Sequence, residues 1–347
     1  MSILQLWLLV LGALVVAGVV AHGVWSARRS AVRQVATEPG DAAAAREPTL
    51  HRPAEPAPAD PAATRIEPTL ARRGGPRLDA LIDAIAAISV ENPVAGETAA
   101  AHLPPARRAG TKPLLVEGLN AESGEWELPM PGQRYGGFQA GVQLANRSGA
   151  LNEIEYSEFV QKVQAFAEPL AALPDFPDML DVVARARELD AFAGQYDAQL
   201  ALRLVSRGPA WSPGYVQQHA ARHGFVTGAL PGRLVLPGLD EGAPPVLTLN
   251  FDAQAALADD PSQAALRELT LAFDVPQTGS AAAPFAAWCA AGEALSTELD
   301  AALYDDGGQP LHPTSFAAIG QELERLYASL AERDLAAGSA AARRLFS

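Results

Sequence analysis

The chain has 347 residues, and its 26 Lys and Arg against 40 Asp and Glu give a formal net charge of −14. This acidic balance argues against nucleic acid as a partner, because neutralising phosphates requires clustered Lys and Arg. The single cysteine, Cys289, excludes an intrachain disulfide and a cysteine-based zinc site within this sequence.

Residues 1–25 are dominated by an apolar run from Ile3 to Ala21 that contains no charged residue. A helix of roughly 20 apolar residues spans the hydrocarbon core of a membrane. Three residues beyond the run suit the membrane–water interface: Trp25, Arg28 and Arg29. We therefore expect a single transmembrane anchor at residues 1–25, with the N-terminus outside and the rest of the chain cytoplasmic. The alternative is a cleaved signal peptide, which would need a basic segment before the run and a shorter apolar stretch.

Residues 26–112 lack aromatic side chains and are rich in Ala, Pro, Glu, Arg and Thr, so we expect a disordered, semi-stiff linker. Within it, residues 78–89 predict a short helix that docks on the folded part or on a partner. Its apolar stripe consists of Leu78, Leu81, Ile82, Ile85 and Ile88. The tetrapeptide Glu-Pro-Thr-Leu occurs at Glu47–Leu50 and again at Glu67–Leu70, either as a docking motif or by chance.

Residues 113–194 are expected to form an accessory α/β module. The expected strands are 114–118, 126–128 and 135–144, and the expected helices are 154–173 and 179–192. One interpretation makes this module a divergent partial repeat of the sequence that follows. In both places a strand, Phe138–Leu144 or Leu269–Val275, is followed by a helix.

Residues 195–335 alternate between strand and helix patterns, and residues 336–347 are expected to be a tail. The expected strands are 197–205, 225–230, 233–236, 246–252 and 269–275, and the expected helices are 212–224, 284–301 and 314–335. Strict alternation of apolar and polar residues favours antiparallel strands with helices on one face. The predicted fold class is therefore α+β: a transmembrane helix, a disordered Pro/Ala-rich linker, and a mostly antiparallel β-sheet with helices packed on one face.

Several short motifs occur in a recognisable order. These are His22-Gly23-x-Trp25 before Arg28-Arg29, Gly224-Phe225-x-x-Gly228, Val275-Pro276, and the stretch from Tyr304-Asp305-Asp306 to Pro313-Thr314. Together they resemble the ZipA family, bacterial cell-division proteins that tether the tubulin-like protein FtsZ to the inner membrane. The resemblance covers residues 1–29 and about 195–330, and it implies an inner-membrane location.

The resemblance also implies a binding site, because the family receives the C-terminal tail peptide of FtsZ on the open face of its sheet. The residues that we expect to contact the peptide are Arg203, Val205, Leu230, Thr248, Asn250, Thr270 and Ala272. In the family this groove is more apolar, with a large aromatic side chain at the position of Ala272.

The sequence contains no nucleophile elbow, phosphate loop or dinucleotide-binding fingerprint, so we expect no enzyme activity, small-molecule substrate or cofactor. His219 and His223 are four residues apart on an expected helix, but no third ligand is found at a suitable spacing, so we interpret them as solvated helix surface. Cys289 is interpreted as a small core residue.

The main hypothesis is a non-enzymatic membrane tether for FtsZ in the division septum. One alternative is a membrane-anchored envelope hydrolase or regulator, and another is a scaffold for a different cytoplasmic partner. The tether hypothesis and the first alternative differ in the side of the membrane on which the C-terminal part lies. Binding of an FtsZ tail peptide distinguishes the tether from the second alternative.

Overall fold

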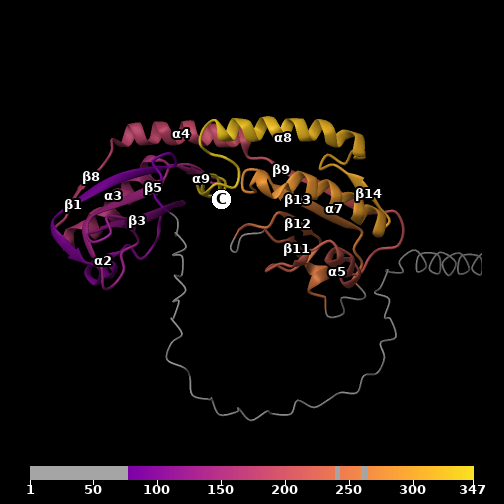
Figure 1. Cartoon of the computed structure of the whole chain (residues 1–347), viewed down its shortest axis with the longest axis horizontal. Coiled ribbons are helices and arrows are strands. Elements are labelled where there is room, and N and C mark those ends of the chain that lie inside the picture. The colour runs from indigo at the N-terminus through magenta and orange to yellow at the C-terminus, as the bar shows by residue number, and fades with distance from the viewer. Residues whose placement is uncertain (1–76, 239–242, 259–263) are drawn as a thin grey trace, which may run out of the picture. The chain divides into compact units, whose positions relative to one another are not determined.

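A computed structural model describes residues 77–238, 243–258 and 264–347, which have an α+β fold with mostly antiparallel sheets (Figure 1). The expected anchor, with Trp25, Arg28 and Arg29, lies outside the described residues. Within the described ranges no helix is long and apolar enough to cross a membrane.

Residues 77–196 form an N-terminal lobe around an antiparallel sheet with strand order β2-β3-β5-β1-β8. Its main strands are β1 (Asp83–Ala95), β2 (Arg108–Ala109), β3 (Lys112–Asn120), β5 (Arg134–Gln143) and β8 (Leu173–Asp175). The short strand β4 (Trp126–Glu127) pairs with β3, and β6 (Ala145–Asn146) pairs with β7 (Gly149–Ala150). The helices of this lobe are α2 (Gly96–His102), α3 (Glu153–Ala167) and α4 (Met179–Tyr196).

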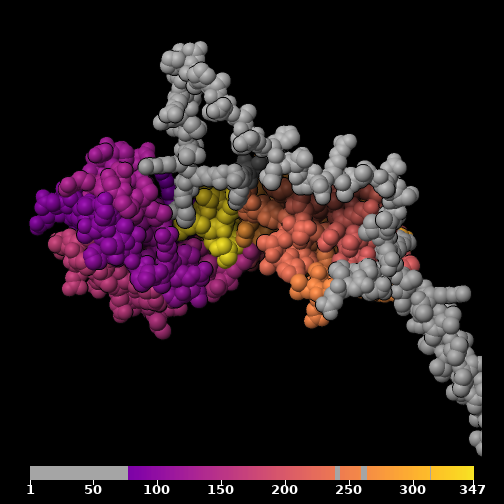
Figure 2. Space-filling model, turned by 90° about the horizontal axis from the view of Figure 1, so that it is seen from below, coloured from indigo at the N-terminus to yellow at the C-terminus, as the bar shows by residue number. Residues whose placement is uncertain are grey.

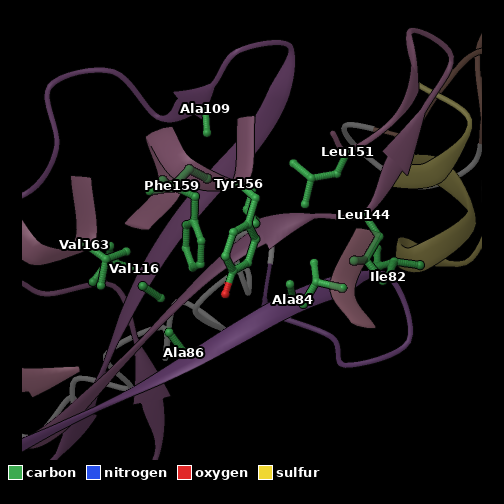
Figure 3. Close-up of a cluster of buried hydrophobic side chains, with 14 of the residues drawn as sticks. Ile82, Ala84, Ala86, Ala109, Val116, Leu144, Leu151, Tyr156, Phe159 and Val163 are labelled. Atoms are coloured by element: carbon green, nitrogen blue, oxygen red, sulfur yellow. The ribbon is translucent and has the colours of Figure 1, made fainter. Parts of the chain in front are cut away.

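Helix α3 begins at a capping box, in which the side chain of Asn152 accepts hydrogen bonds from the backbone N–H groups of Ile154 and Glu155. The helix then places Tyr156, Phe159 and Val163 against the sheet, where they share one core with alternate residues of β1 (Figure 3). Because successive side chains of a strand point to opposite faces, the remaining residues of β1 lie on the other face of the sheet, here called the outer face.

The short helix expected at residues 78–89 is wrong, because this segment leads into the 13-residue strand β1. Ala84, Ala86 and Ile88 are buried at alternate positions, which is the period of a strand, whereas Ile85 of the expected stripe pairs with Gly141 and lies on the other face. Pairing of β1 with both β5 and β8 decides between the two periods. The expected linker boundary at residue 112 is wrong for the same reason, since residues 77–112 already contribute β1, α2 and β2.

Residues 197–335 form a C-terminal lobe around a second antiparallel sheet with order β10-β11-β12-β13-β9-β14. Its strands are β9 (Gln199–Ser206), β10 (Val226–Thr227), β11 (Arg233–Leu236), β12 (Leu247–Asn250), β13 (Glu268–Asp274) and β14 (Ala301–Tyr304). Its helices are α5 (Pro213–Arg222), α6 (Ala253–Ala256), α7 (Pro284–Glu298) and α8 (Phe316–Ala331).

Two tryptophans fix the core of the C-terminal lobe between its helices and its sheet. Trp211 and Trp288 are 0% and 1% exposed, and their indole N–H groups donate to Leu299 O at 2.9 Å and Leu271 O at 3.1 Å. Both indoles therefore bury a large apolar surface without leaving a donor unpaired. The alternating pattern expected for β13 is confirmed, because Leu269, Leu271 and Phe273 are buried.

The two lobes have the same order of elements and the same order of strands in their sheets. Strands β1, β2, β3, β5 and β8 correspond to β9, β11, β12, β13 and β14, and α2, α3 and α4 correspond to α5, α7 and α8. Every corresponding pair of neighbouring strands is antiparallel. The correspondence thus covers five of the six strands in each sheet, all except β4 and β10, which is more than the partial repeat considered from the sequence.

The expected tail at residues 336–347 is wrong, because it contains helix α9 (Ala340–Leu345), whose buried residues belong to the core of the N-terminal lobe. The last residues of the chain, in yellow, lie beside this lobe (Figures 1 and 2). Leu345 and Phe346 are each 1% exposed. The guanidinium of Arg344 contacts both carboxylate oxygens of Asp83, which is fully buried, at 2.5 and 2.8 Å. The last residues of the chain therefore complete the first lobe.

Candidate functional site

The register of the C-terminal sheet places most of the expected binding residues side by side on its outer face. One row across the strands consists of Arg233, Asn250, Thr270, Arg203 and Tyr304. The next row consists of Val235, Thr248, Ala272 and Ala201. On the other side of the first row, Val205 pairs with Glu268 and Ala302. Leu230 lies outside these rows, in the turn between β10 and β11, and is 57% exposed.

The row that contains Ala272 holds only small side chains, and we call it the small-residue lane: Val235, Thr248, Ala272 and Ala201. All four are half-buried. Because no side chain longer than valine stands in it, an extended segment can lie across the strands in close contact with the sheet.

Arginines border the lane on the side of Thr270. Arg203 donates from Nε and Nη2 to the two carboxylate oxygens of Glu268, at 2.6 and 2.8 Å. This hydrogen bonding lowers the pKa of Glu268 and raises that of Arg203. Arg233 donates to Asn250 Oδ1 at 3.1 Å. The face therefore combines small apolar contacts with two cations at its border.

The opposite border of the lane is fixed by Arg147, which comes from the N-terminal lobe. Its guanidinium contacts Asp197 at 2.5 Å and Asp274 at 2.7 Å. Asp274 is the last residue of β13, so this contact joins the edge of the face to the first lobe. Sequence reasoning had no signal for this pair, because the two partners are 127 residues apart.

The outer face of the N-terminal sheet shows how a chain segment lies at the corresponding position. The sheets can be aligned because Leu144 N donates to Ile82 O in one lobe and Val275 N donates to Ala198 O in the other. Counting from these bonds, Gly141 corresponds to Ala272. By the same count Leu115 corresponds to Thr248, Ile85 to Ala201, Ala87 to Arg203, Gln139 to Thr270 and Glu117 to Asn250.

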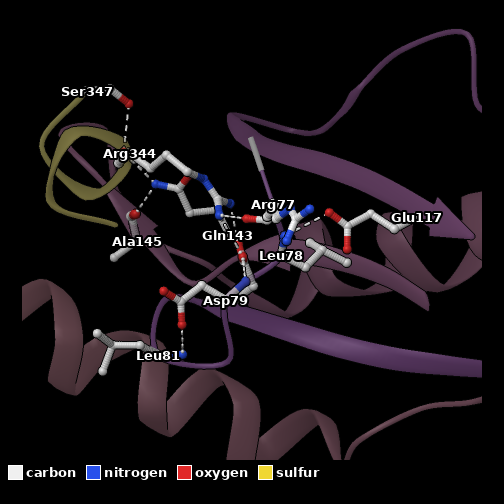
Figure 4. A network of polar contacts seen from close by, with 10 residues as sticks. Arg77, Leu78, Asp79, Leu81, Glu117, Gln143, Ala145, Arg344 and Ser347 are labelled. Carbon is white, nitrogen blue, oxygen red and sulfur yellow. Dashed lines mark hydrogen bonds and ion pairs between the residues drawn. The ribbon is translucent and has the colours of Figure 1, made fainter. Parts of the chain in front are cut away.

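Leu78, from the segment that precedes β1, covers Gly141 on this outer face. A Cβ built on Gly141 would lie only 2.3 Å from Leu78 Cδ2, so the absence of a side chain permits the contact. The backbone N–H of Leu78 donates to Glu117 Oε1 at 3.1 Å, and Glu117 is 3% exposed (Figure 4). In the N-terminal lobe, therefore, Leu78 lies over the counterpart of Ala272. In the C-terminal lobe, Ala272 is where the sequence predicts that a peptide binds.

The two histidines that were considered as metal ligands are not simply solvated helix surface. His219 Nδ1 and His223 Nε2 lie 2.8 and 3.0 Å from the two carboxylate oxygens of Glu298, a residue of α7. The arrangement ties α5 to α7. Among the described residues, no group of three or more His, Cys, Asp or Glu is placed to hold a metal ion.

Cys289 is half-buried beside the core of the C-terminal lobe, and burial raises the pKa of its thiol to about 11. A thiol with a raised pKa is a poor nucleophile at neutral pH, since the thiolate is the reactive form.

Neither protein-family models nor curated proteins give a match to this chain.

Proposed function

We propose that this chain is a non-enzymatic cell-division tether that holds FtsZ at the cytoplasmic face of the inner membrane. In this proposal residues 1–25 span the membrane once, with the N-terminus in the periplasm, and Trp25, Arg28 and Arg29 lie at its interface. The outer face of the C-terminal sheet binds the C-terminal tail peptide of FtsZ. The motifs that resemble the ZipA family are the source of the partner's identity.

One observation supports the choice of face. Leu78 packs on Gly141 while its backbone N–H is held by Glu117, so this type of sheet receives an apolar side chain and a backbone donor on its outer face. The corresponding groups in the C-terminal lobe are Ala272 and the side-chain amide of Asn250. A peptide leucine lying over Ala272 would reproduce the contact.

The charges at the border of the lane are compatible with a peptide that carries carboxylates beside its apolar residues. Arg233 and Arg203 lie in the row next to Ala272, and Arg203 is already engaged by Glu268. A peptide carboxylate would therefore compete with Glu268 for Arg203, which lowers the net gain from that contact. We expect the apolar contact over the small-residue lane to contribute most of the affinity.

The test is a titration of the full chain with a fluorescent FtsZ tail peptide, followed by anisotropy. Ala272→Arg should abolish binding, because an arginine blocks the lane, while the melting temperature changes little. The matched control is Ala87→Arg, an exposed position on the outer face of the N-terminal sheet, which should bind as the wild type does. Normal binding by Ala272→Arg would exclude this face as the site.

The proposed topology has its own test. A reporter fused after Ser347 should be active only when it is of a type that functions in the cytoplasm. Activity of a reporter that functions only in the periplasm would contradict the tether and favour the envelope alternative.

A further inference from the structure

Among the described residues, the N-terminal lobe has only a short counterpart of β11, the strand that lies beside β12 in the C-terminal lobe. In the C-terminal lobe, β11 pairs with all four residues of β12, from Leu247 to Asn250. The corresponding residues of β3 run from Leu114 to Glu117. Here β2 pairs only with Lys112 and Pro113, and β4 pairs only with Gly118 and Leu119. Between these two short partners, no described strand lies opposite Val116.

The backbone of Val116 faces this gap. Leu114 N donates outward to Arg107 O at 2.9 Å, and Asn120 N donates outward to Glu125 O at 2.9 Å. In an antiparallel strand, alternate residues direct their N–H and C=O groups to the same side. The N–H and C=O of Val116 therefore point away from β5, toward the place that β11 fills in the other lobe.

A cavity of about 260 Å³ occupies this place. Its apolar lining includes Leu103, Pro104, Leu115, Leu128, Pro129 and Met130. Apolar cavities of about 150 Å³ already take a molecule as large as benzene, so this one has room for an aliphatic or aromatic side chain. An unpaired strand edge beside an apolar cavity is the arrangement in which extended peptides add to a sheet.

Arg107 gives the site its charge preference. It lines the cavity, is exposed, and its guanidinium forms no ion pair with another described residue. A carboxylate next to the inserted side chain would be paired there by a charge-assisted hydrogen bond.

We propose that this gap, bounded by β2, β3 and β4, is a second binding site, which takes a short extended segment of a partner protein. The segment adds to β3 at Val116, inserts one apolar side chain into the cavity, and presents a carboxylate to Arg107. The site is on a different lobe from the FtsZ-binding face proposed above, so it does not depend on that proposal.

The test is a selection of random hexapeptides, displayed on phage, against the immobilised full chain. The expected peptides carry an apolar residue beside an acidic one. Their affinity should fall at least tenfold for Arg107→Glu, which loses a charge-assisted bond, and for Leu128→Trp, which fills the cavity. The matched control is Arg207→Glu, an exposed arginine of the C-terminal lobe, which should leave the affinity unchanged.

Three results would overturn the proposal. The first is a selection that yields no saturable binder. The second is a set of peptides that lose binding only in Ala272→Arg, because these peptides use the outer face of the C-terminal sheet. The third is a dimer of the full chain that Arg107→Glu dissociates, because a second copy then occupies the gap.

Discussion

The two lobes build the same order of strands on their sheets but differ in what lies on the outer face. In the N-terminal lobe, Leu78 covers Gly141 and is held by Glu117. In the C-terminal lobe, the corresponding position is Ala272, in a lane of small, half-buried side chains. In our proposal, the same architecture uses this face for its own chain in one lobe and for a partner in the other.

The two sheets also differ in the pairing along β12 and along its counterpart β3, and here the C-terminal lobe is the one that is more fully paired. In the C-terminal lobe β11 pairs along β12, whereas in the N-terminal lobe no described strand pairs with β3 at Val116. The N-terminal lobe also needs the last residues of the chain, since Leu345 and Phe346 belong to its core. The shared order of strands is therefore supplemented differently in the two lobes, by a longer β11 in the C-terminal lobe and by the last residues of the chain in the N-terminal lobe.

The largest expected effect comes from ending the chain at Ser339, which removes α9 from one lobe only. Loss of two core side chains costs roughly 2–5 kcal/mol each, and Asp83 is left buried without its cation. Together these losses approach the whole stability of a domain, about 5–15 kcal/mol. Hydrogen exchange should show lost protection in β1 and β5 with β13 still protected. Unchanged protection in β1 would mean that the N-terminal lobe does not depend on α9.

Replacing Arg344 with alanine tests the buried ion pair alone. We expect a loss of roughly 3–5 kcal/mol in the free energy of unfolding of the N-terminal lobe, because the fully buried Asp83 carboxylate loses its partner. The double variant Asp83→Leu/Arg344→Met should recover part of this loss. The control is Arg325→Ala, whose pair with Glu322 is about 70% exposed on both sides, and which should cost less than about 1 kcal/mol. Equal losses of unfolding free energy in Arg344→Ala and Arg325→Ala would contradict the assignment of Arg344 and Asp83 as a buried ion pair.

The close contact between Leu78 and Gly141 can be tested by a double-mutant cycle. Gly141→Ala should destabilise the N-terminal lobe by about 1 kcal/mol, because the new Cβ displaces the end of the Leu78 side chain. In a Leu78→Ala background the same change should cost little. Additive costs in the denaturant midpoints would show that Leu78 does not lie on Gly141 in solution.

The smallest expected effect concerns Glu298, which links α5 to α7 in the C-terminal lobe. The hydrogen bond from His219 lowers the pKa of Glu298 below its usual 4.5, and His223 lowers it further. A carboxylate with a lowered pKa adds stability above pH 4.5 and loses this contribution as the pH falls through the folded-state value. Glu298→Gln should therefore cost less than about 1 kcal/mol above pH 4.5, and this difference should shrink as the pH falls through the lowered pKa. A difference that grows on acidification would contradict the assigned contacts.

The sequence was sufficient to predict much of the C-terminal lobe. Its strands alternate cleanly, so the register of β13 could be predicted, with Leu271 and Phe273 in the core and Ala272 on the outer face. The lane became visible only with the pairing of strands, because it combines residues from β11, β12, β13 and β9. At its border Arg203 was predicted, but its pairing with Glu268 was missed for the same reason, since the two residues are 65 positions apart.

The N-terminal lobe was predicted less well, for identifiable reasons. In the segment that leads into β1, Ile82, Ile85 and Ile88 recur at a helical spacing, and the alternately buried Ala84 and Ala86 are too small to outweigh them, so the pattern alone gave a helix. Helix α9 has only six residues, and its burial depends on contacts such as Arg344 with Asp83, 261 residues away. Short elements whose stability comes from distant partners leave little local signal.

The central proposal, that the outer face of the C-terminal sheet binds the FtsZ tail, is tested most directly by photo-crosslinking at corresponding positions of the two sheets. Benzoylphenylalanine would replace Thr270 in one full-length variant and Gln139, its counterpart in the N-terminal lobe, in another. With the FtsZ tail peptide added, we expect a crosslink from position 270 and none from position 139. A crosslink from position 139 alone, or from neither position at saturating peptide, would contradict the proposal.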